Sequence, residues 1–211
     1  MSANGIRRRG LMLVLSSPSG AGKTTISRKL LERDDNLELS ISATTRPKRP
    51  GERDGRDYRF VDLTEFNLMI NRQELLEHAH VFGHYYGASS ADTEAALAAG
   101  EDLVLVIDVQ GARQVRGFGR DTVGIFVLPP SAAVLEQRLR GRSRDDEAQI
   151  HTRLRVARSE VGEYSGYEYV VVNDDLNAAV ERLRAIVLAE RARVERMREP
   201  AAAVVNTFRQ D

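Results

Sequence analysis

The sequence has no cysteine in its 211 residues, and this absence excludes disulfide bonds, thiolate metal sites and cysteine nucleophiles. It also lacks long hydrophobic runs: the longest are about five residues, far short of the ~20 that span a membrane. The 31 basic and 31 acidic side chains leave no net charge that would recruit nucleic acid or acidic lipid. What remains is ordinary globular composition, 42% hydrophobic and 29% charged, and the length suits one α/β domain with a small insertion.

The basic run Arg7-Arg8-Arg9 resembles the start of a signal peptide. The apolar stretch after it is too short, however, and a glycine-rich segment interrupts it. We therefore expect a cytoplasmic protein, either monomeric or homodimeric, that binds neither membranes nor nucleic acid.

A glycine-rich segment lies between an apolar run at 11–15 and an amphipathic run at 26–31, an order that predicts strand, turn and helix. Gly20 and Gly22 have no Cβ, so the backbone can curl and turn its N–H groups inward onto an anion. The helix that begins near Lys23 points its positive end at the same place. The segment therefore predicts a loop that binds the phosphates of a nucleotide, made of Ser17, Pro18, Ser19, Gly20, Ala21, Gly22, Lys23, Thr24 and Thr25.

Two side chains of this loop carry specific chemistry. Lys23 would bring a positive charge to the β- and γ-phosphates, and the hydroxyl of Thr24 would bind Mg²⁺. Ser17 stands where the usual pattern has its first glycine, which is tolerable if its backbone stays in an allowed region. A chance turn rich in serine and glycine is the alternative, but chance rarely supplies the strand, the helix and the Lys-Thr pair together.

Four apolar runs, at 11–15, 103–107, 122–128 and 170–172, alternate with helical patterns along the chain. This alternation predicts a parallel α/β sheet, in which ligands bind at the carboxyl ends of the strands. The loop, Asp108 and Asn173 all follow such runs directly. We therefore expect them to meet at one edge of the sheet.

The domain organisation follows from these patterns. We expect a flexible N-terminus at 1–10, a core formed by 11–41, 89–140 and 163–197, a polar insertion at 42–88, a lid and its following helix at 141–162, and an unpacked tail at 198–211. Within the insertion we expect a helix over 64–70 capped by Thr64, and two strands over 75–87 that turn near Gly83. The last helix is expected over about 176–197.

Several motifs occur together in one order, and they resemble the guanylate kinases over residues 11–197. They are Ser19-Gly20-Ala21-Gly22-Lys23-Thr24, Ser42-Ala43-Thr44-Thr45-Arg46-Pro47, Gly51-Glu52, Gly55-Arg56-Asp57-Tyr58, Tyr85-Tyr86-Gly87, Ile107-Asp108-Val109-Gln110-Gly111, Gly141-Arg142 and Val172-Asn173-Asp174. The resemblance implies a three-layer P-loop kinase core with a parallel sheet, a small mixed αβ insertion for the nucleoside monophosphate, and a helical lid. It also implies Mg²⁺-dependent transfer of phosphate from ATP to GMP or dGMP, as in purine nucleotide metabolism and GMP recycling.

The same resemblance implies roles for individual residues. Arg46, Arg49, Tyr58 and Tyr86 would hold the GMP phosphate, because guanidinium forks and phenols suit a dianion. Glu77 would accept from guanine N1–H and N2–H₂, Ser42 would add a base contact, and Asp108 would lie near GMP and hold Mg²⁺ through water. Arg138, Arg142 and Arg153 would be lid arginines that act in catalysis with Lys23 and Arg46, and Asn173 would contact adenine.

The sequence departs from the family pattern at two further positions. Val106 stands where the family often has the first Asp of an Asp-x-Asp pair, so Asp108 acts alone. Ala88 stands where a hydroxyl usually contacts the base, and the adjacent Ser89 or a water is a possible substitute.

Two other functions are alternatives to guanylate kinase activity. A related ribosyl bisphosphate kinase would not need Glu77 to read guanine. A binding module with a guanylate-kinase-like fold would have a degraded loop, whereas Lys23, Thr24, Arg142 and Asn173 are all present here. The intact loop and lid therefore favour catalysis.

Overall fold

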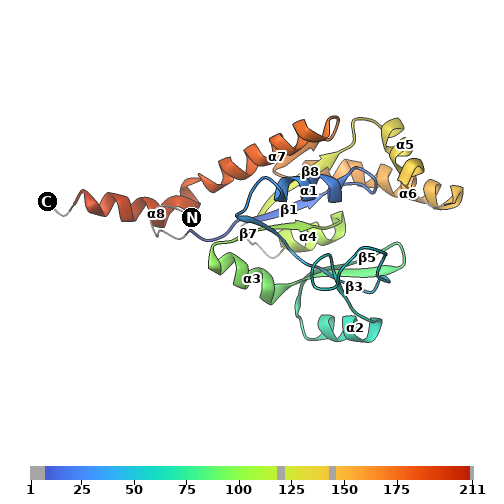
Figure 1. Ribbon diagram of the computed structural model, residues 1–211, viewed down its shortest axis with the longest axis horizontal. Coiled ribbons are helices and arrows are strands. Elements are labelled where there is room, and N and C mark those ends of the chain that lie inside the picture. Colours follow the sequence, from blue (N-terminus) through green and yellow to red (C-terminus); the bar gives the residue numbers. More distant parts are fainter. Residues whose placement is uncertain (1–7, 118–121, 143–145, 210–211) are drawn as a thin grey trace.

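The computed structural model describes residues 8–117, 122–142 and 146–209, and its elements are labelled in Figure 1. The strands are β1 Met12–Ser16, β2 Leu37–Leu39, β3 Ala43–Thr44, β4 Arg59–Phe60, β5 Leu75–Val81, β6 His84–Ser89, β7 Asp102–Val106, β8 Thr122–Leu128 and β9 Tyr169–Val172. The helices are α1 Lys23–Leu31, α2 Leu63–Asn71, α3 Ser90–Ala99, α4 Val109–Gly117, α5 Ala132–Arg142, α6 Glu147–Glu160, the short 3-10 helix η1 Val161–Gly166, α7 Leu176–Arg191 and α8 Val194–Thr207.

The four predicted apolar runs form β1, β7, β8 and β9, and β2 joins them in a parallel sheet ordered β2-β7-β1-β8-β9, so the predicted fold class is confirmed. β1 lies in the centre, and its side chains alternate between two cores. Leu13 packs on one face of the sheet with residues of α1 and α7. Val14 packs on the other face with residues of α3 and α4. The chain thus has three layers, helix, sheet and helix, and each strand of the middle layer ends at the same edge.

A second sheet, ordered β4-β3-β6-β5, forms the insertion and lies below the central sheet in Figure 1. β5 and β6 pair antiparallel and turn at Phe82 and Gly83, where the sequence predicts the turn. Phe66 and Met69 of α2 pack against Ala43 of β3 and close one face of this sheet. Other side chains of the insertion, among them Tyr58, Glu77 and Tyr86, line a cavity together with the glycine-rich loop.

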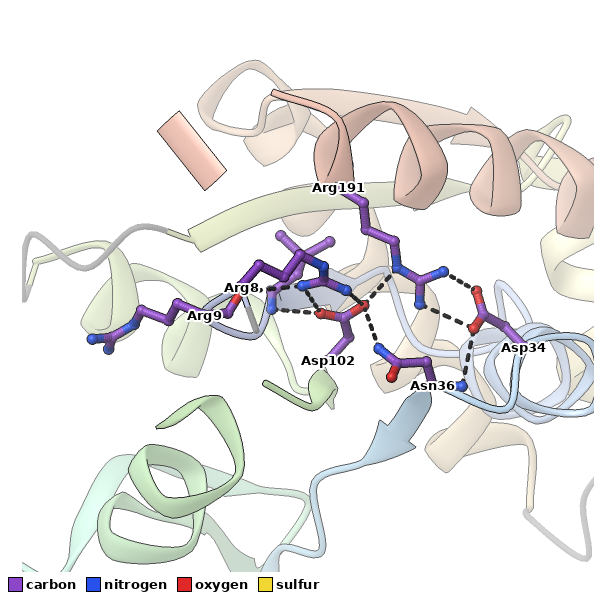
Figure 2. A network of polar contacts seen from close by, with 7 residues as sticks. Arg8, Arg9, Asp34, Asn36, Asp102 and Arg191 are labelled. Carbon is purple, nitrogen blue, oxygen red and sulfur yellow. Dashed lines mark hydrogen bonds and ion pairs between the residues drawn. The ribbon is translucent and has the colours of Figure 1, made fainter. Parts of the chain in front are cut away.

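Asp102 begins β7 at the edge of the sheet opposite the loop, and it centres a buried network of ion pairs (Figure 2). Its side chain is fully buried and accepts hydrogen bonds from both Nη atoms of Arg8 at 2.6 Å and from Nε of Arg191 at 2.6 Å. Arg191 also donates to Asp34 at 2.6 and 3.0 Å. The network joins the segment before β1, the start of β7 and the end of α7.

The structure corrects the expected N-terminus. Residues 8–10 are not loose, because Arg8 is held by Asp102 and the Gly10 N–H donates to the carbonyl of Leu97 at 2.8 Å. The remaining residues of the expected flexible segment, 1–7, lie outside the described residues. A buried acid 94 positions away holds Arg8, so no local pattern could have indicated this contact.

Two helix boundaries also differ from the prediction. Asp62, not Thr64, caps α2, because its carboxylate accepts the Glu65 N–H at 2.8 Å. The helix predicted over 176–197 ends at Arg191, and a separate helix, α8, continues through Pro200 into the expected tail. Most of α8 beyond Pro200 is exposed, and it projects away from the body in Figure 1. None of the helices in the described part of the chain is long and apolar enough to cross a membrane.

Candidate active site

The glycine-rich loop joins β1 to α1 at the carboxyl edge of the sheet. Gly20 and Gly22 have φ of 89° and 101°, a conformation that residues with a Cβ rarely adopt. A Cβ on Gly22 would also lie 2.5 Å from Nδ2 of Asn173. Among the described residues, positive φ outside glycine occurs only at Gln73 and Phe82, so Ser17 keeps an allowed backbone. Its replacement of the usual glycine is therefore tolerated.

Lys23 begins α1 and lies among buried groups. Its Nζ donates to the carbonyl of Ile107 at 2.9 Å and to that of Ser17 at 3.3 Å, so the ammonium bridges the ends of β7 and β1. Burial lowers the pKa of Lys23 below its usual 10.5, although the charges of Asp108 and Glu160 act in the opposite direction. The ammonium is thus held at the loop by contacts that an anionic ligand can replace.

The loop separates two cavities, and Gly20 and Gly22 line both. The first, about 290 Å³, lies between the loop, the end of β7 and the insertion. The second, about 460 Å³, lies between the loop, α5 and the end of β9. Predicted residues that line the first are Ser17, Pro18, Ser19, Lys23, Thr24, Ser42, Tyr58, Glu77, Tyr86 and Asp108. Predicted residues that line the second are Thr25, Arg138 and Asn173.

Glu77 lies on β5 at the floor of the first cavity and is only 3% exposed. Its Oε1 accepts the Ala88 N–H at 3.0 Å across the β5–β6 pair. Burial raises the pKa of Glu77 from its usual 4.5 to about 8, and the charge of Asp108 adds to the rise. The Ala88 N–H opposes this rise but does not outweigh burial. A buried carboxylate with one oxygen uncommitted is suited to a ligand that offers adjacent N–H donors.

Ala88 and Ser89 differ in their availability to a ligand. Ala88 is fully buried and packs against the core, but it pairs with Glu77 across β5 and β6, so its methyl lies on the same face of the sheet as the Glu77 side chain. The Ser89 hydroxyl accepts the Asp92 N–H at 3.2 Å and so caps α3. Its commitment to the helix end argues against Ser89 as the substitute for the family hydroxyl.

Asp108 follows β7 and lines the same cavity as Glu77. Its Oδ1 accepts the Gly111 N–H at 2.9 Å, and its Oδ2 accepts from Gln110 at 3.2 Å, so it also holds the first turn of α4. Thr24 is exposed toward the cavity. No group of three or more His, Cys, Asp or Glu side chains forms a metal cluster within the described residues. One hydroxyl and one carboxylate nevertheless fit Mg²⁺, which keeps several waters and binds substrate phosphates.

The insertion brings Tyr58 and Tyr86 to the first cavity, and Arg46 contacts the ring of Tyr58. Arg46 is 7% exposed and donates to Glu52 at 2.7 Å, with its guanidinium 5.3 Å from the centre of the Tyr58 ring. The hydrogen bond from Arg46 lowers the pKa of Glu52. Tyr58 and Tyr86 lie edge to face, 6.0 Å apart. Arg49 contributes its backbone N–H to Glu52 and leaves its side chain in solvent.

The predicted lid arginines lie in different places. Arg138 of α5 donates to the backbone carbonyl of Asn173 at 2.9 Å and borders the second cavity. Arg153 of α6 lies over the ring of Phe82, 5.1 Å from its centre, so this part of α6 contacts the tip of the insertion. Arg142 ends α5, and its side chain lies outside the described residues. Asn173 donates to the carbonyl of Ala21 at 2.8 Å and supports the loop.

Glu160, at the end of α6, is a cavity residue that the sequence motifs do not indicate. Its Oε2 is buried without a hydrogen-bond partner. Burial raises the pKa of Glu160, while the positive charge of Lys23 and the Ser19 N–H act against the rise. Glu160 lies in an arginine-rich helix far along the chain from the loop, and only the folded arrangement brings it there.

Comparisons with known proteins agree with this geometry. The sequence model of the guanylate kinase family matches residues 9–190. A guanylate kinase of Nitrobacter winogradskyi is 52% identical over 194 residues, which cover 92% of this chain and 89% of that protein. A guanylate kinase of Rhodospirillum rubrum is 51% identical over 205 residues, covering 97% and 94%.

A solved structure gives the same result. The crystal structure of guanylate kinase from Anaplasma phagocytophilum matches with a TM-score of 0.75 at 38% identity, and covers 90% of this chain and 91% of that one. The sequence match extends over nearly the whole chain, and the structural match covers nine-tenths of it. The chain therefore belongs to the guanylate kinase family.

Proposed function

We propose that the chain transfers phosphate from ATP to GMP across the glycine-rich loop, with GMP in the first cavity and the nucleoside of ATP in the second. The activity, ATP-dependent phosphorylation of GMP to GDP, follows from membership in the family. The observation that supports the arrangement most is that Gly20 and Gly22 line both cavities. A phosphate held by that loop is within reach of ligands on both sides. A ribosyl bisphosphate kinase and a non-catalytic binding module are not favoured.

On the acceptor side, we assign guanine to Glu77 and the phosphate to the basic and phenolic groups. An ionised Glu77 can accept from the N1–H and N2–H₂ of guanine, whereas adenine presents an acceptor at N1 and has no 2-amino group. Ser42, which lines the same cavity, adds a contact to the base. The phosphate is held by Arg46, Arg49, Tyr58 and Tyr86. Glu52 and the Tyr58 ring hold the Arg46 fork in place before GMP arrives, which reduces the ordering that binding requires.

The nucleophile is a phosphate oxygen, and no side chain need act as a general base, because its second pKa is about 6. Catalysis then depends on positioning and on charge stabilisation. Lys23 moves from the carbonyls of Ile107 and Ser17 onto the phosphates, and Arg138, Arg142 and Arg153 add positive charge as the lid closes. Thr24, and Asp108 through water, would hold Mg²⁺, which neutralises phosphate charge when bound. Asn173 contacts adenine.

The cytoplasm, where both nucleotides are available, is the compartment we propose for this activity. dGMP is a second acceptor of the same chemistry, because guanine recognition does not involve the sugar. We propose a monomer or homodimer, since each chain carries both cavities.

The variant Lys23→Met tests the assignment of the loop. We expect turnover to fall on the order of 10²–10⁴-fold, because charge stabilisation in the transition state is lost. GMP binding, measured by calorimetry, should change little, since Lys23 lies on the loop side of the cavity. Lys29→Met, the same substitution later on α1 and outside both cavities, is the matched control. Near-normal turnover in folded Lys23→Met would contradict the proposal.

A further inference from the structure

We propose that Gly111, in the first turn of α4, positions the carboxylate of Glu77 and thereby sets selectivity for guanine. Gly111 is a positioning residue, not a catalytic one, and the inference rests on the proposed role of Glu77. Guanine selection would then involve a second segment of the same chain, because α4 follows β7 of the core whereas Glu77 belongs to the insertion.

The contact between the two residues is too close for any side chain at position 111. A Cβ on Gly111 would lie 2.1 Å from Oε2 of Glu77 and 2.9 Å from its carboxyl carbon. Cβ atoms essentially never approach another heavy atom within 3.0 Å. The carboxylate of Glu77 therefore occupies space that only a glycine on α4 leaves open.

The backbone of Gly111 gives no other reason for a glycine. Gly111 is not among the glycines with positive φ. It lies inside a regular helix, where alanine is favoured over glycine. Its N–H donates to Asp108 Oδ1 at 2.9 Å, a bond that alanine can also make. The close approach of Glu77 is thus the feature that requires the missing Cβ.

Glu77 has little room to accommodate a methyl group without losing its position. Its side chain is 3% exposed, and the Ala88 N–H holds Oε1 at 3.0 Å. The atom that would have to move, Oε2, is the oxygen without a protein donor in the described structure. Because that atom is at the flexible end of the side chain, a methyl on Gly111 should displace the carboxylate and leave the backbone of α4 in place. The pair of oxygens would then no longer match the two guanine donors.

The first experiment compares Gly111→Ala with Gly162→Ala in steady-state assays with GMP and AMP as acceptors. Gly162 lies in η1, and a Cβ there meets nothing within 4 Å, so it controls for the substitution itself. We expect Gly111→Ala to raise the KM for GMP roughly ten- to hundredfold, the equivalent of one hydrogen bond to a charged group. The kcat should change much less, because the base contact is made equally before and during the reaction. Gly162→Ala should match the wild type.

A double-mutant cycle tests whether Gly111 affects guanine selection through Glu77. Glu77→Ala removes the carboxylate, so Gly111→Ala added to it should not change the GMP/AMP ratio of kcat/KM further. Equal ratios in Glu77→Ala and the double variant support the proposal. A further fall in the double variant would show that Gly111 acts elsewhere. If Gly111→Ala does not fold, recovery of folding in the double variant supports the contact, and failure of both overturns it.

The cycle also separates the inference from the function on which it rests. If Glu77→Ala narrows the GMP/AMP ratio while Gly111→Ala leaves it unchanged, the positioning role is wrong and the guanine role of Glu77 stands. If Glu77→Ala leaves the ratio unchanged, Glu77 does not select guanine, and the role of Gly111 in selection is wrong with it.

Discussion

GMP binding should depend on pH through Glu77. The proposed contact needs an ionised carboxylate, because a protonated one turns an O–H toward the N–H donors of guanine. In the free protein burial raises the pKa of Glu77 to about 8, with Asp108 adding to the rise and the Ala88 N–H opposing it. Below that pH most molecules must lose a proton before they bind GMP. Binding should therefore release a proton at neutral pH.

The size of the effect follows from the titration. With a pKa of about 8, ionisation limits GMP affinity by about tenfold at pH 7 and about a hundredfold at pH 6, relative to high pH. The affinity should therefore rise with pH and level off above the pKa. Glu77→Gln, which does not titrate, should bind GMP more weakly at high pH and lack this slope.

Calorimetry of GMP binding across pH 6–9 measures this slope, and buffers of different ionisation enthalpy report the proton released. The second pKa of GMP's own phosphate, about 6, adds a slope at low pH that Glu77→Gln shares, so the difference between the two proteins isolates Glu77. Parallel slopes in the two proteins between pH 6.5 and 8.5 would refute the reasoning.

The same shift has a consequence for stability. Because the folded pKa lies above the usual 4.5, the unfolded chain ionises first, and Glu77 lowers the free energy of unfolding as pH rises from about 4.5 to about 8. The loss approaches on the order of 4–5 kcal/mol at ~1.4 kcal/mol per unit. Glu77→Gln should accordingly unfold at a higher denaturant concentration than the wild type at pH 8, and at a similar one at pH 4.

Three further substitutions test the fold and the base contact. Asp102→Asn should lower the free energy of unfolding by about 3–5 kcal/mol without changing the KM for GMP, because Arg8 and Arg191 lose a buried charged partner. The control is Asp174→Asn, the same substitution at an exposed position. Equal denaturation midpoints for Asp102→Asn and the wild type would contradict the prediction. Burial would raise the pKa of Asp102, but these contacts hold it below its usual 3.8. The contribution of Asp102 to the free energy of unfolding is therefore present above the usual pKa and is lost as pH falls through the folded pKa. Ala88→Ser should tighten the Kd for GMP up to about tenfold and leave AMP unaffected, since it supplies the missing hydroxyl. Ser89→Ala should lower stability by about 1 kcal/mol through loss of the α3 cap and leave the Kd unchanged; a weaker GMP Kd in Ser89→Ala would mean that Ser89 contacts the base after all.

The sequence predicted the features that local patterns encode. The run at 11–15, the glycines after it and Lys23 specify strand, turn and helix through backbone chemistry alone. The four buried runs are apolar because both faces of a parallel strand are covered, so a parallel sheet could be predicted, although the order of its strands could not. The turn at Gly83 was predictable for a similar local reason.

What escaped prediction depends on contacts between distant segments. In the sequence, Glu160 is one of many charged residues in an arginine-rich helix, and nothing local indicates burial. Only the packing of α6 against the loop buries it. Gly111 belongs to a motif, but the need for a glycine there arises from the close approach of Glu77, which belongs to another sheet. Arg8 has no local partner and is ordered by Asp102. The helix α8 was missed because Pro200 indicates a helix end, whereas here the proline lies within the helix.

The most direct measurement of the central claim is the rate of ADP formation from ATP and Mg²⁺ with GMP, AMP or ribose bisphosphate as the acceptor, with the products identified by chromatography. The account predicts rapid conversion of GMP to GDP, one GDP for each ADP, with AMP and ribose bisphosphate far slower. Comparable turnover of AMP or ribose bisphosphate, or GMP binding without any turnover, would contradict it.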